Sequence, residues 1–370
     1  MRAFSRLLLM VLIISGLIIV SAVDSYASFQ EYGTLSFVVK ESEYLYDNIR
    51  YQFDNVIMLD YGLQINEGNV IGCSYLSLNY SQKYDVLLFG LRKGYFAYQS
   101  GNFQFELGKN RIMYGVGYVW NPSDIINPRK SPLYRDEKKR DDEGVYYGSL
   151  SYYGFLDNLA YEIRGVFLPA KEDLMESREV LSLKLSWQPL ETTCVLGFKA
   201  DEKPIYAGNI RYTLSSFPVT VYGEFCHHET DDLRQYLLGF QFDPSFEILD
   251  GNIQGQFEYF RNENSYQHEV VAYYDYYPGK APTLGELYQN YLYTGLTYYS
   301  LDFSVSLGII KNIDNDGSGI INYLVNYPLN DESSLSLGGY LPFGRDVDEF
   351  PYFTNKNHEI YLMLSVSFGI

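Results

Sequence analysis

The chain has 370 residues, a formal net charge of −18 at pH 7 and a sequence pI of about 4.6. An acidic balance of this size argues against nucleic-acid binding, which needs a basic surface. The three cysteines, Cys73, Cys194 and Cys226, include no C-x-x-C pair and cannot all pair within one chain, so the sequence indicates no disulfide framework. Aromatic residues make up 17% of the chain, which is high for a soluble globular domain.

The N-terminal residues 1–27 are predicted to be a secretory signal peptide. Arg2 and Arg6 precede an apolar run over residues 7–23, and the small residues Ser25 and Ala27 stand at the −3 and −1 positions of a cleavage site after Ala27. The apolar run is longer than the ~7–15 residues of an ordinary signal core, so a retained membrane anchor stays open as an alternative. No cysteine follows the run, which argues against lipoprotein processing.

Apolar and polar residues alternate through most of residues 28–370. The last segment shows the pattern well, since Leu362, Leu364 and Val366 alternate with Met363 and Ser365. A strand with this period has one apolar and one polar face. When nearly every strand of a secreted chain has this pattern, the apolar faces are expected to meet lipid, and aromatic residues are expected at both membrane interfaces. The sequence therefore predicts an all-β fold, a transmembrane antiparallel β-barrel, as one domain over residues 28–370.

We predict about 18 strands, with 16 as an alternative, and an even number is usual for bacterial barrels. In chain order they cover residues 33–40, 54–66, 69–80, 84–99, 103–113, 143–153, 157–167, 179–188, 191–200, 204–214, 218–227, 235–243, 251–262, 289–299, 302–311, 318–327, 334–341 and 358–370. A β-bulge is expected between Leu91 and Phe96, because the outward face otherwise changes parity there. Residues 267–276 alternate less clearly and are assigned to an outer loop.

The connections between these strands fall into two length classes that alternate along the chain. Short turns, such as those at Glu67-Gly68 and at residues 100–102, occupy one set of connections. The long segments all fall in the other set, at residues 41–53, 114–142, 168–178, 263–288 and 342–357. Short periplasmic turns and long outer loops distinguish bacterial barrels. A soluble sandwich has no reason to sort its loops in this way.

One segment is similar to known barrel families. Gly108, Arg111 and Ile112 form a G-x-x-R-I element, and residues 120–128 read W-N-P-S-D-I-I-N-P. This pair of elements resembles porin-like bacterial outer-membrane barrels of the alginate-export type and related families. In general porins the loop at this position folds into the lumen, so the resemblance implies a constriction loop at residues 114–142. The two Asn-Pro turns predict a compact loop, and its mixed charges would create a transverse field. The simpler alternative is a solvated surface loop.

Charged residues at inward positions are candidates for the lining of a pore, because charged rings or ladders set ion preference. Asp302 is one further inward carboxylate. The hypothesis for pore-lining and constriction residues comprises Arg111, Asp124, Arg129, Lys130, Arg135, Arg164, Lys184, Lys199, Arg211, Glu162, Glu224 and Glu258. On the predicted register Lys199 lies near the outer end, while Lys184 and Arg211 lie lower. The alternative is that these groups are ordinary lumen residues satisfied by water and by one another.

Motifs for enzymatic chemistry are weak. The sequence has no G-x-S-x-G and no H-E-x-x-H element. His227 and His228 are adjacent on a strand and point to opposite faces, which disfavours a shared metal ion. Gly115 and Gly117 lack a third glycine and a following helix, so a nucleotide loop is not indicated. No catalytic residue, metal or cofactor is predicted.

The function that the sequence favours is a porin-like outer-membrane channel for passive diffusion of small hydrophilic solutes. Its expected partners are the outer-membrane lipid, these solutes and the barrel insertion machinery. The last strands of such barrels usually end in an aromatic residue that this machinery recognises, whereas here Phe368 stands two residues before the end. Trimers are common among general porins, so a homotrimer is open. Two alternatives remain: a non-conducting barrel in surface-polysaccharide export or assembly, and a soluble or anchored β-rich surface protein.

Overall fold

A computed structural model describes most of the chain beyond residue 27. The described residues are 28–44, 50–81, 86–127, 144–170, 177–214, 217–230, 232–242, 251–263, 288–314, 317–345, 348–353 and 358–369. The predicted signal peptide, residues 267–276 and the charged part of the long loop that includes Arg129, Lys130 and Arg135 lie outside these residues.

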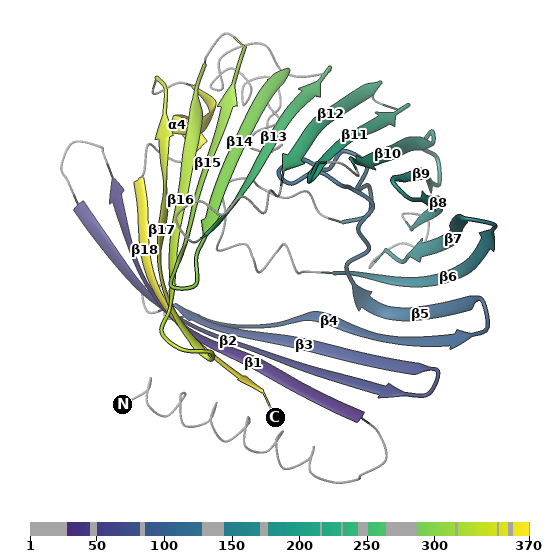
Figure 1. The fold of residues 1–370 in the computed structure, drawn as a ribbon, viewed down its shortest axis with the longest axis horizontal. Coiled ribbons are helices and arrows are strands. Elements are labelled where there is room, and N and C mark those ends of the chain that lie inside the picture. The colour runs from purple at the N-terminus through teal and green to yellow at the C-terminus, as the bar shows by residue number, and fades with distance from the viewer. Residues whose placement is uncertain are drawn as a thin grey trace.

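The described residues form 18 antiparallel strands in one sheet. They are β1 (Ser28–Tyr44), β2 (Arg50–Glu67), β3 (Val70–Ser81), β4 (Val86–Ser100), β5 (Phe103–Asn110), β6 (Val145–Leu156), β7 (Leu159–Leu168), β8 (Arg178–Trp187), β9 (Leu190–Lys199), β10 (Ile205–Thr213), β11 (Val219–His228), β12 (Leu233–Phe242), β13 (Asn252–Asn262), β14 (Asn290–Tyr299), β15 (Ser304–Asn312), β16 (Gly319–Pro328), β17 (Ser333–Phe343) and β18 (His358–Gly369). Each strand pairs with its neighbours in sequence, and β1 pairs with both β2 and β18 (Figure 1). The sheet is therefore a closed barrel without a free edge, as the alternation predicts.

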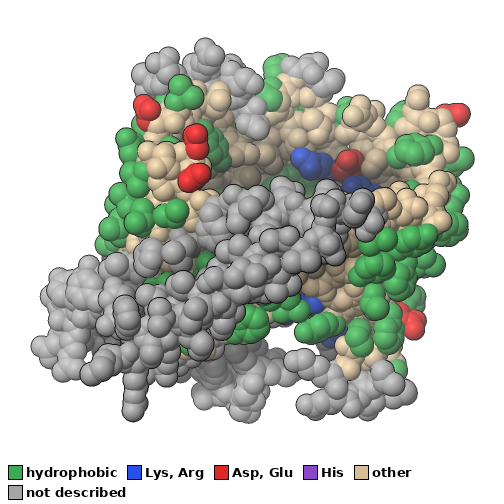
Figure 2. All heavy atoms as spheres, turned by 90° about the horizontal axis from the view of Figure 1, so that it is seen from below, with side chains coloured by type: hydrophobic (Ala, Val, Ile, Leu, Met, Phe, Trp, Pro, Cys, Tyr) green, Lys and Arg blue, Asp and Glu red, His purple; other side chains and the backbone are tan. Residues whose placement is uncertain are grey.

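The outer face of the barrel is apolar, as a lipid-facing surface requires. Along β15 and β18 the exposed side chains are Val305, Leu307 and Ile309, and then Leu362 and Leu364. Figure 2 shows hydrophobic side chains gathered on the flanks of the molecule, basic side chains together with an acidic one in its hollow, and further acidic side chains at its edges. This distribution is the reverse of a soluble protein, which buries its apolar side chains in a core.

The expected bulge lies at Arg92. Lys93 pairs with Tyr75 and Leu91 pairs with Leu76, so Arg92 is the extra residue of β4. Its buried guanidinium lies 3.2 Å from a carboxylate oxygen of Asp60 on β2. The bulge changes the parity of β4, so that Leu87 and Phe89 before it and Phe96 and Tyr98 after it are all exposed. Among the described strand pairings, only that of β3 with β4 shows such a shift, so the outward residues of the other strands keep one parity.

Several strand boundaries differ from the expected ones. β1 covers Ser28–Tyr44 instead of residues 33–40, and β2 begins at Arg50 instead of at residue 54. Two further differences change the expected lumen residues or the long loop. β5 ends at Asn110 rather than at residue 113, so the long loop begins three residues earlier than expected. β15 begins at Ser304, and Asp302 lies exposed in the turn before it instead of pointing into the lumen. In this turn Ser300 Oγ accepts the backbone N–H groups of Asp302 and Phe303, and these bonds hold the chain away from the sheet ladder.

Connections at the two ends of the barrel differ in length as predicted, except that β1 and β2 leave only residues 45–49 between them where a long segment over 41–53 was expected. The short turns at Gly68 and Gly101 contain a glycine at positive φ and join β2 to β3 and β4 to β5. Because the strands alternate in direction, the connections from β5 to β6, β13 to β14 and β17 to β18 all lie at the opposite end. The last of these contains a short helix, α4 (Glu349–Phe353). No helix among the described residues is long and apolar enough to cross a membrane.

Candidate functional site: a loop packed on the inner wall

After β5 the chain turns into the barrel and follows its inner wall. Figure 1 shows this segment rising from the end of β5 towards β10, β11 and β12 within the ring of strands. We call residues 111–127 the inner loop. The contacts of its side chains and backbone involve inward residues of β8 to β14, as described below. The inner loop therefore lies along one side of the barrel wall.

Glu224 of β11 binds the inner loop through both oxygens of its carboxylate. Oε1 accepts the backbone N–H groups of Val116 and Gly117, each at 2.6 Å. Oε2 accepts the backbone N–H of Ser123 at 3.0 Å and its hydroxyl at 2.7 Å. The two ends of the segment 116–123 are thus held by one side chain, which is only 5% exposed.

Glu258 of β13 binds the backbone of the middle of this segment, residues 118–120, through both oxygens of its carboxylate. Oε1 accepts the backbone N–H of Tyr118 and, at 2.8 Å, the hydroxyl of Tyr222. Oε2 accepts the backbone N–H groups of Val119 at 2.9 Å and Trp120 at 3.5 Å. The carboxylate is fully buried. An ionised carboxylate can only accept hydrogen bonds, and every partner of these two side chains is a donor, so the arrangement matches the charged form of both.

Neighbouring strands add polar contacts to the inner loop. Asn209 of β10 donates through its amide to the carbonyl of Tyr114 and, at 3.4 Å, to Ser123 Oγ. Ser182 of β8 donates to the hydroxyl of Tyr114 at 3.1 Å. Backbone groups that leave a strand must find other partners when they are buried. Side chains of β10, β11 and β13 supply those partners here, and Ser182 of β8 adds a bond to a loop side chain.

An aromatic cluster holds the middle of the inner loop. Trp120 is 3% exposed and stacks on Phe260 of β13 with ring centroids 5.2 Å apart and an interplanar angle of 7°. The ring of Tyr291 on β14 lies 5.9 Å from that of Trp120. Tyr118 stacks on Tyr293 at 5.5 Å but stays half-exposed. Aromatic pairs of this kind contribute about 0.5–1.5 kcal/mol beyond their burial, which adds to the two carboxylate anchors.

Close packing accounts for the two glycines of the Gly115-x-Gly117 pair, for which a nucleotide loop was considered above. A Cβ atom at Gly117 would lie 1.9 Å from the carbonyl oxygen of Trp120 and 2.4 Å from a methyl group of Leu237. A Cβ atom at Gly115 would lie 2.4 Å from the side chain of Asn121. Both glycines are required by close packing of the loop on itself and on the wall.

The far end of the inner loop is closed by Asp124 and Asn127. The Asp124 carboxylate accepts both the backbone N–H of Asn127, at 3.3 Å, and its amide, at 2.9 Å. The same amide donates to the carbonyl of Ile112 at 2.6 Å, which joins the end of the loop to its beginning. Burial raises the pKa of Asp124 above its usual value, and the bonds from Asn127 and the charge of Arg111 oppose that rise. These bonds close residues 111–127 into an ordered loop, whereas Pro128 of the second Asn-Pro turn and residues 129–142 lie outside the described residues.

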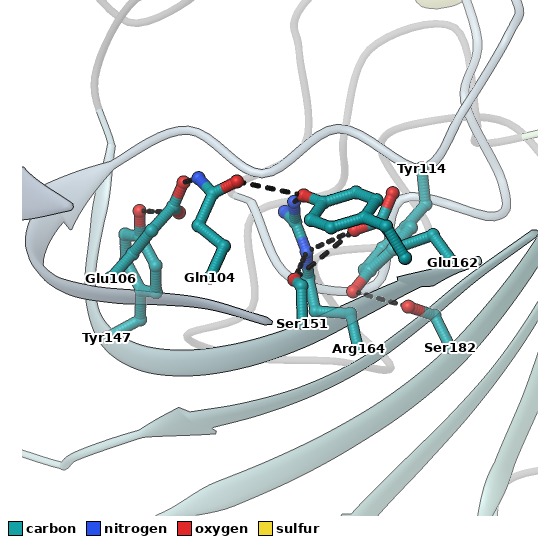
Figure 3. A network of polar contacts seen from close by, with 9 residues as sticks. Gln104, Glu106, Tyr114, Tyr147, Ser151, Glu162, Arg164 and Ser182 are labelled. Atoms are coloured by element: carbon teal, nitrogen blue, oxygen red, sulfur yellow. Dashed lines mark hydrogen bonds and ion pairs between the residues drawn. The ribbon is translucent and has the colours of Figure 1, made fainter. Parts of the chain in front are cut away.

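A network of polar side chains covers the wall beside the start of the loop (Figure 3). Arg164 Nε of β7 lies 2.8 Å from both Ser151 Oγ and Glu162 Oε1. Figure 3 shows Glu106 and Tyr147 on one side of this pair and Tyr114 and Ser182 on the other. Tyr147 donates to Glu106 at 2.7 Å. Arg164 and Glu162 lie on the inner wall, and they neutralise each other.

The other predicted basic residues occupy different heights on the inner wall. Lys184 is half-exposed and lies 3.9 Å from Glu191. Arg211 pairs in register with Glu191 and is exposed nearer the short-turn end. Lys199 donates to Glu202 at 2.6 Å in the turn after β9, and this bond lowers the pKa of Glu202. These three cations therefore lie at different heights on the inner wall and do not form one ring.

The anchoring role of Glu224 and Glu258 was not predicted, although the sequence contains a signal for it. Inward positions of a water-filled barrel are polar, yet four inward residues of β12 to β16 are apolar and buried: Leu237, Phe260, Ile310 and Ile320. Apolar residues on both faces of consecutive strands indicate that something covers the inner face. Reading the inward positions as a set would have located the wall on which the inner loop packs.

Comparisons with known proteins agree on the fold. No known protein family and no curated protein sequence matches the chain. Among solved structures, Pseudomonas aeruginosa OccK5 (OpdH) is similar with a TM-score of 0.59 at 9% sequence identity, over 93% of this chain and 98% of that one. The outer membrane protein OpdK of the same organism has a TM-score of 0.56 at 7% identity, over 93% and 99%. The chain thus shares a barrel fold with these proteins over nearly its whole length.

Proposed function

We propose that the chain is an outer-membrane channel through which small hydrophilic solutes diffuse passively. The observation that carries this proposal is the one-sided placement of the inner loop. A loop that packs along β8 to β14 narrows a barrel of 18 strands, and the hydrogen bonds that hold it come from β8, β10, β11 and β13, on one side of the sheet. The similarity to a protein named as an outer membrane protein supports the location.

The opposite wall has the composition of a surface facing water. Inward positions of β16, β17, β18 and β1 include Asn326, Ser336, Ser365 and Ser36. Their side chains bond to one another across the strands: Ser336 to Asn326 at 2.8 Å, and Ser36 to Ser365 at 3.0 Å. Ser36 and Ser336 are buried by their surroundings, whereas Asn326 and Ser365 are partly exposed and can offer hydrogen bonds to a hydrated solute. The proposed path therefore runs between this wall and the inner loop.

No chemical step is needed for this function. A closed barrel satisfies all backbone groups in lipid, and a loop inside it selects solutes by size. Selection among solutes by charge would then come from charged side chains on the inner wall: Lys184, Arg211 and the pair of Arg164 and Glu162. Arg129, Lys130 and Arg135 are proposed to contribute to the same constriction, which extends the inner loop towards residue 142.

Conductance across a planar bilayer tests the proposal. The refolded mature chain is expected to give discrete current steps, and a salt gradient would reveal its preference between anions and cations. Heat-dependent mobility on a detergent gel confirms that the tested material is a folded barrel. Current silence from a folded, inserted barrel would reject the channel and favour a non-conducting barrel that acts in the export or assembly of a surface polysaccharide.

Reversal of charge at Arg211 is expected to shift ion selectivity. Arg211→Glu changes the charge of the lumen by two units at an exposed inward site. Two unit charges at ~10 Å in water interact by about 0.4 kcal/mol before screening. A change of two units shifts the energies of a cation and an anion by about 0.8 kcal/mol each in opposite directions, so the cation-to-anion permeability ratio should rise severalfold at low salt. Lys203→Glu, at an exposed site in the outer turn after β9, is the matched control and should change the ratio much less. Equal shifts in both variants would place the selective region at the outer rim.

Three further features stay part of the proposal. The segment of residues 108–128 would mark a relation to alginate-export-type barrels. The closing strand would be recognised by the barrel insertion machinery. A homotrimer would be the assembly expected from general porins, and crosslinking in detergent would test it.

A further inference from the structure

A second connection also folds onto the inner wall. Residues 344–345 and 348–353, between β17 and β18, form what we call the second loop. Asp348 accepts the backbone N–H of Arg345 at 2.6 Å and lies 2.9 Å from its guanidinium. Gly344 has a φ of +130°, and a Cβ atom there would lie 2.7 Å from Cβ of Ser318, so the turn requires glycine. These contacts direct the chain from β17 inward to α4.

The helix α4 places one apolar and one acidic side chain against the wall. Phe350 is fully buried in the same cluster as Ile310 of β15 and Ile320 of β16, both of which are inward residues. Glu349 is also fully buried. Its carboxylate accepts the hydroxyl of Tyr291 at 2.6 Å. The second loop is thus attached by apolar burial and by a hydrogen bond to a buried carboxyl group.

Tyr291 lies between the two loops and contacts both. One side of its ring faces Trp120 of the inner loop at 5.9 Å. Its ring also meets Phe350 of the second loop edge-on, with centroids 6.4 Å apart. Its hydroxyl accepts the backbone N–H of Tyr288 at 2.7 Å while donating to Glu349. The side chain is fully buried.

We infer that Tyr291 is a positioning residue that couples the second loop to the inner loop, so that the two loops act as one constriction. The inference rests on the proposed function, because a constriction has meaning only in a channel. Trp120, Tyr291 and Phe350 belong to one buried cluster. Interiors packed at this density do not deform continuously. Release of the second loop therefore loosens the inner loop, although each is anchored separately.

The test measures the accessibility of one loop after a change in the other. Val119→Cys places a thiol on the inner loop, where Val119 packs partly buried against the cluster. The three native cysteines are replaced by alanine in the same background. The rate of reaction with a charged methanethiosulfonate reagent is then followed by mass spectrometry in folded, lipid-inserted barrels. Phe350→Ala and Glu349→Ala are expected to raise this rate about tenfold, and Tyr291→Phe severalfold.

A conservative variant and a matched control separate positioning from general damage. Glu349→Gln keeps a side-chain oxygen that can accept the Tyr291 hydroxyl, so its rate should stay close to that of the background. Tyr259→Phe removes a comparable bond, from the Tyr259 hydroxyl to Asn290 at 2.5 Å on the outward side of the same region, and should also leave the rate unchanged. Rates within twofold of the background in Phe350→Ala, Glu349→Ala and Tyr291→Phe would overturn the inference.

The readout distinguishes this inference from the proposed function. Thiol reaction requires no ionic current, so coupled rates together with a silent bilayer would reject the channel and retain the coupling. Current steps together with uncoupled rates would reject the coupling and retain the channel. In a conducting barrel, Phe350→Ala should also make the open-channel current noisier than Tyr259→Phe does.

Discussion

In the double variant Glu224→Gln and Glu258→Gln, the inner loop is expected to leave the wall, and single-channel conductance should become severalfold larger and noisy. Each carboxylate receives four donors, two on each oxygen. A glutamine offers one acceptor oxygen and turns an NH₂ group towards the remaining donors. A buried donor left without a partner costs about 1–3 kcal/mol. The double change therefore removes more free energy than the aromatic contacts of Trp120 supply.

The matched control is Glu162→Gln. Glu162 is also an inward carboxylate on the same side of the barrel, but its partners are Arg164 and Ser151 of the wall. This control should change ion selectivity by removing a negative charge while leaving the size and noise of the current steps nearly unchanged. If the double variant conducts like the control in step size and noise, the carboxylates do not hold the constriction. Proteolysis of the loop in folded barrels gives a second reading, with faster cleavage expected in the double variant.

The strands were predictable because their local pattern and their environment agree. Along β15 the lipid contacts every second residue, so Leu307 and Ile309 alternate with Ser306 and Gly308 whatever lies inside the barrel. The bulge at Arg92 was predictable for the same reason, since the lipid-facing side chains of β4 require a change of parity. Long-range pairing added little ambiguity, because each strand pairs with its sequence neighbour and only β1 and β18 meet across the whole chain.

The loop anchors were not predictable from alternation alone. In the sequence Glu224 and Glu258 have the same inward parity as Glu162, and parity does not say whether an inward carboxylate faces water or a backbone. That difference depends on inner-loop residues that are separated from the two carboxylates by between 101 and 140 positions along the chain. Only the apolar inward residues, such as Leu237 and Ile320, carry a local trace of the covering loop. The second loop left a similar trace at Ile310, and the sequence pattern of residues 342–357 gave no sign of it.

A charge on the outer face should strongly destabilise the barrel in lipid, whereas the same charge one residue away should have little effect. Leu307→Arg puts a guanidinium on the exposed apolar face near the middle of β15. Arginine at the bilayer midplane costs a transmembrane barrel about 2–4 kcal/mol. Ser306→Arg puts the same group on the inward face, where it loses the bond from Thr297 at 3.1 Å and gains a polar surrounding. Its cost should be about 1 kcal/mol or less.

Urea titrations of both variants in lipid vesicles measure the difference directly, provided that unfolding is reversible. The midpoint should fall much further for Leu307→Arg than for Ser306→Arg, because only the first places a charge in hydrocarbon. Equal losses would mean that both faces of β15 meet environments of similar polarity. Such a result would contradict a lipid-facing outer surface and would favour a soluble or anchored β-rich protein. The apolar exterior of the barrel would then need another explanation.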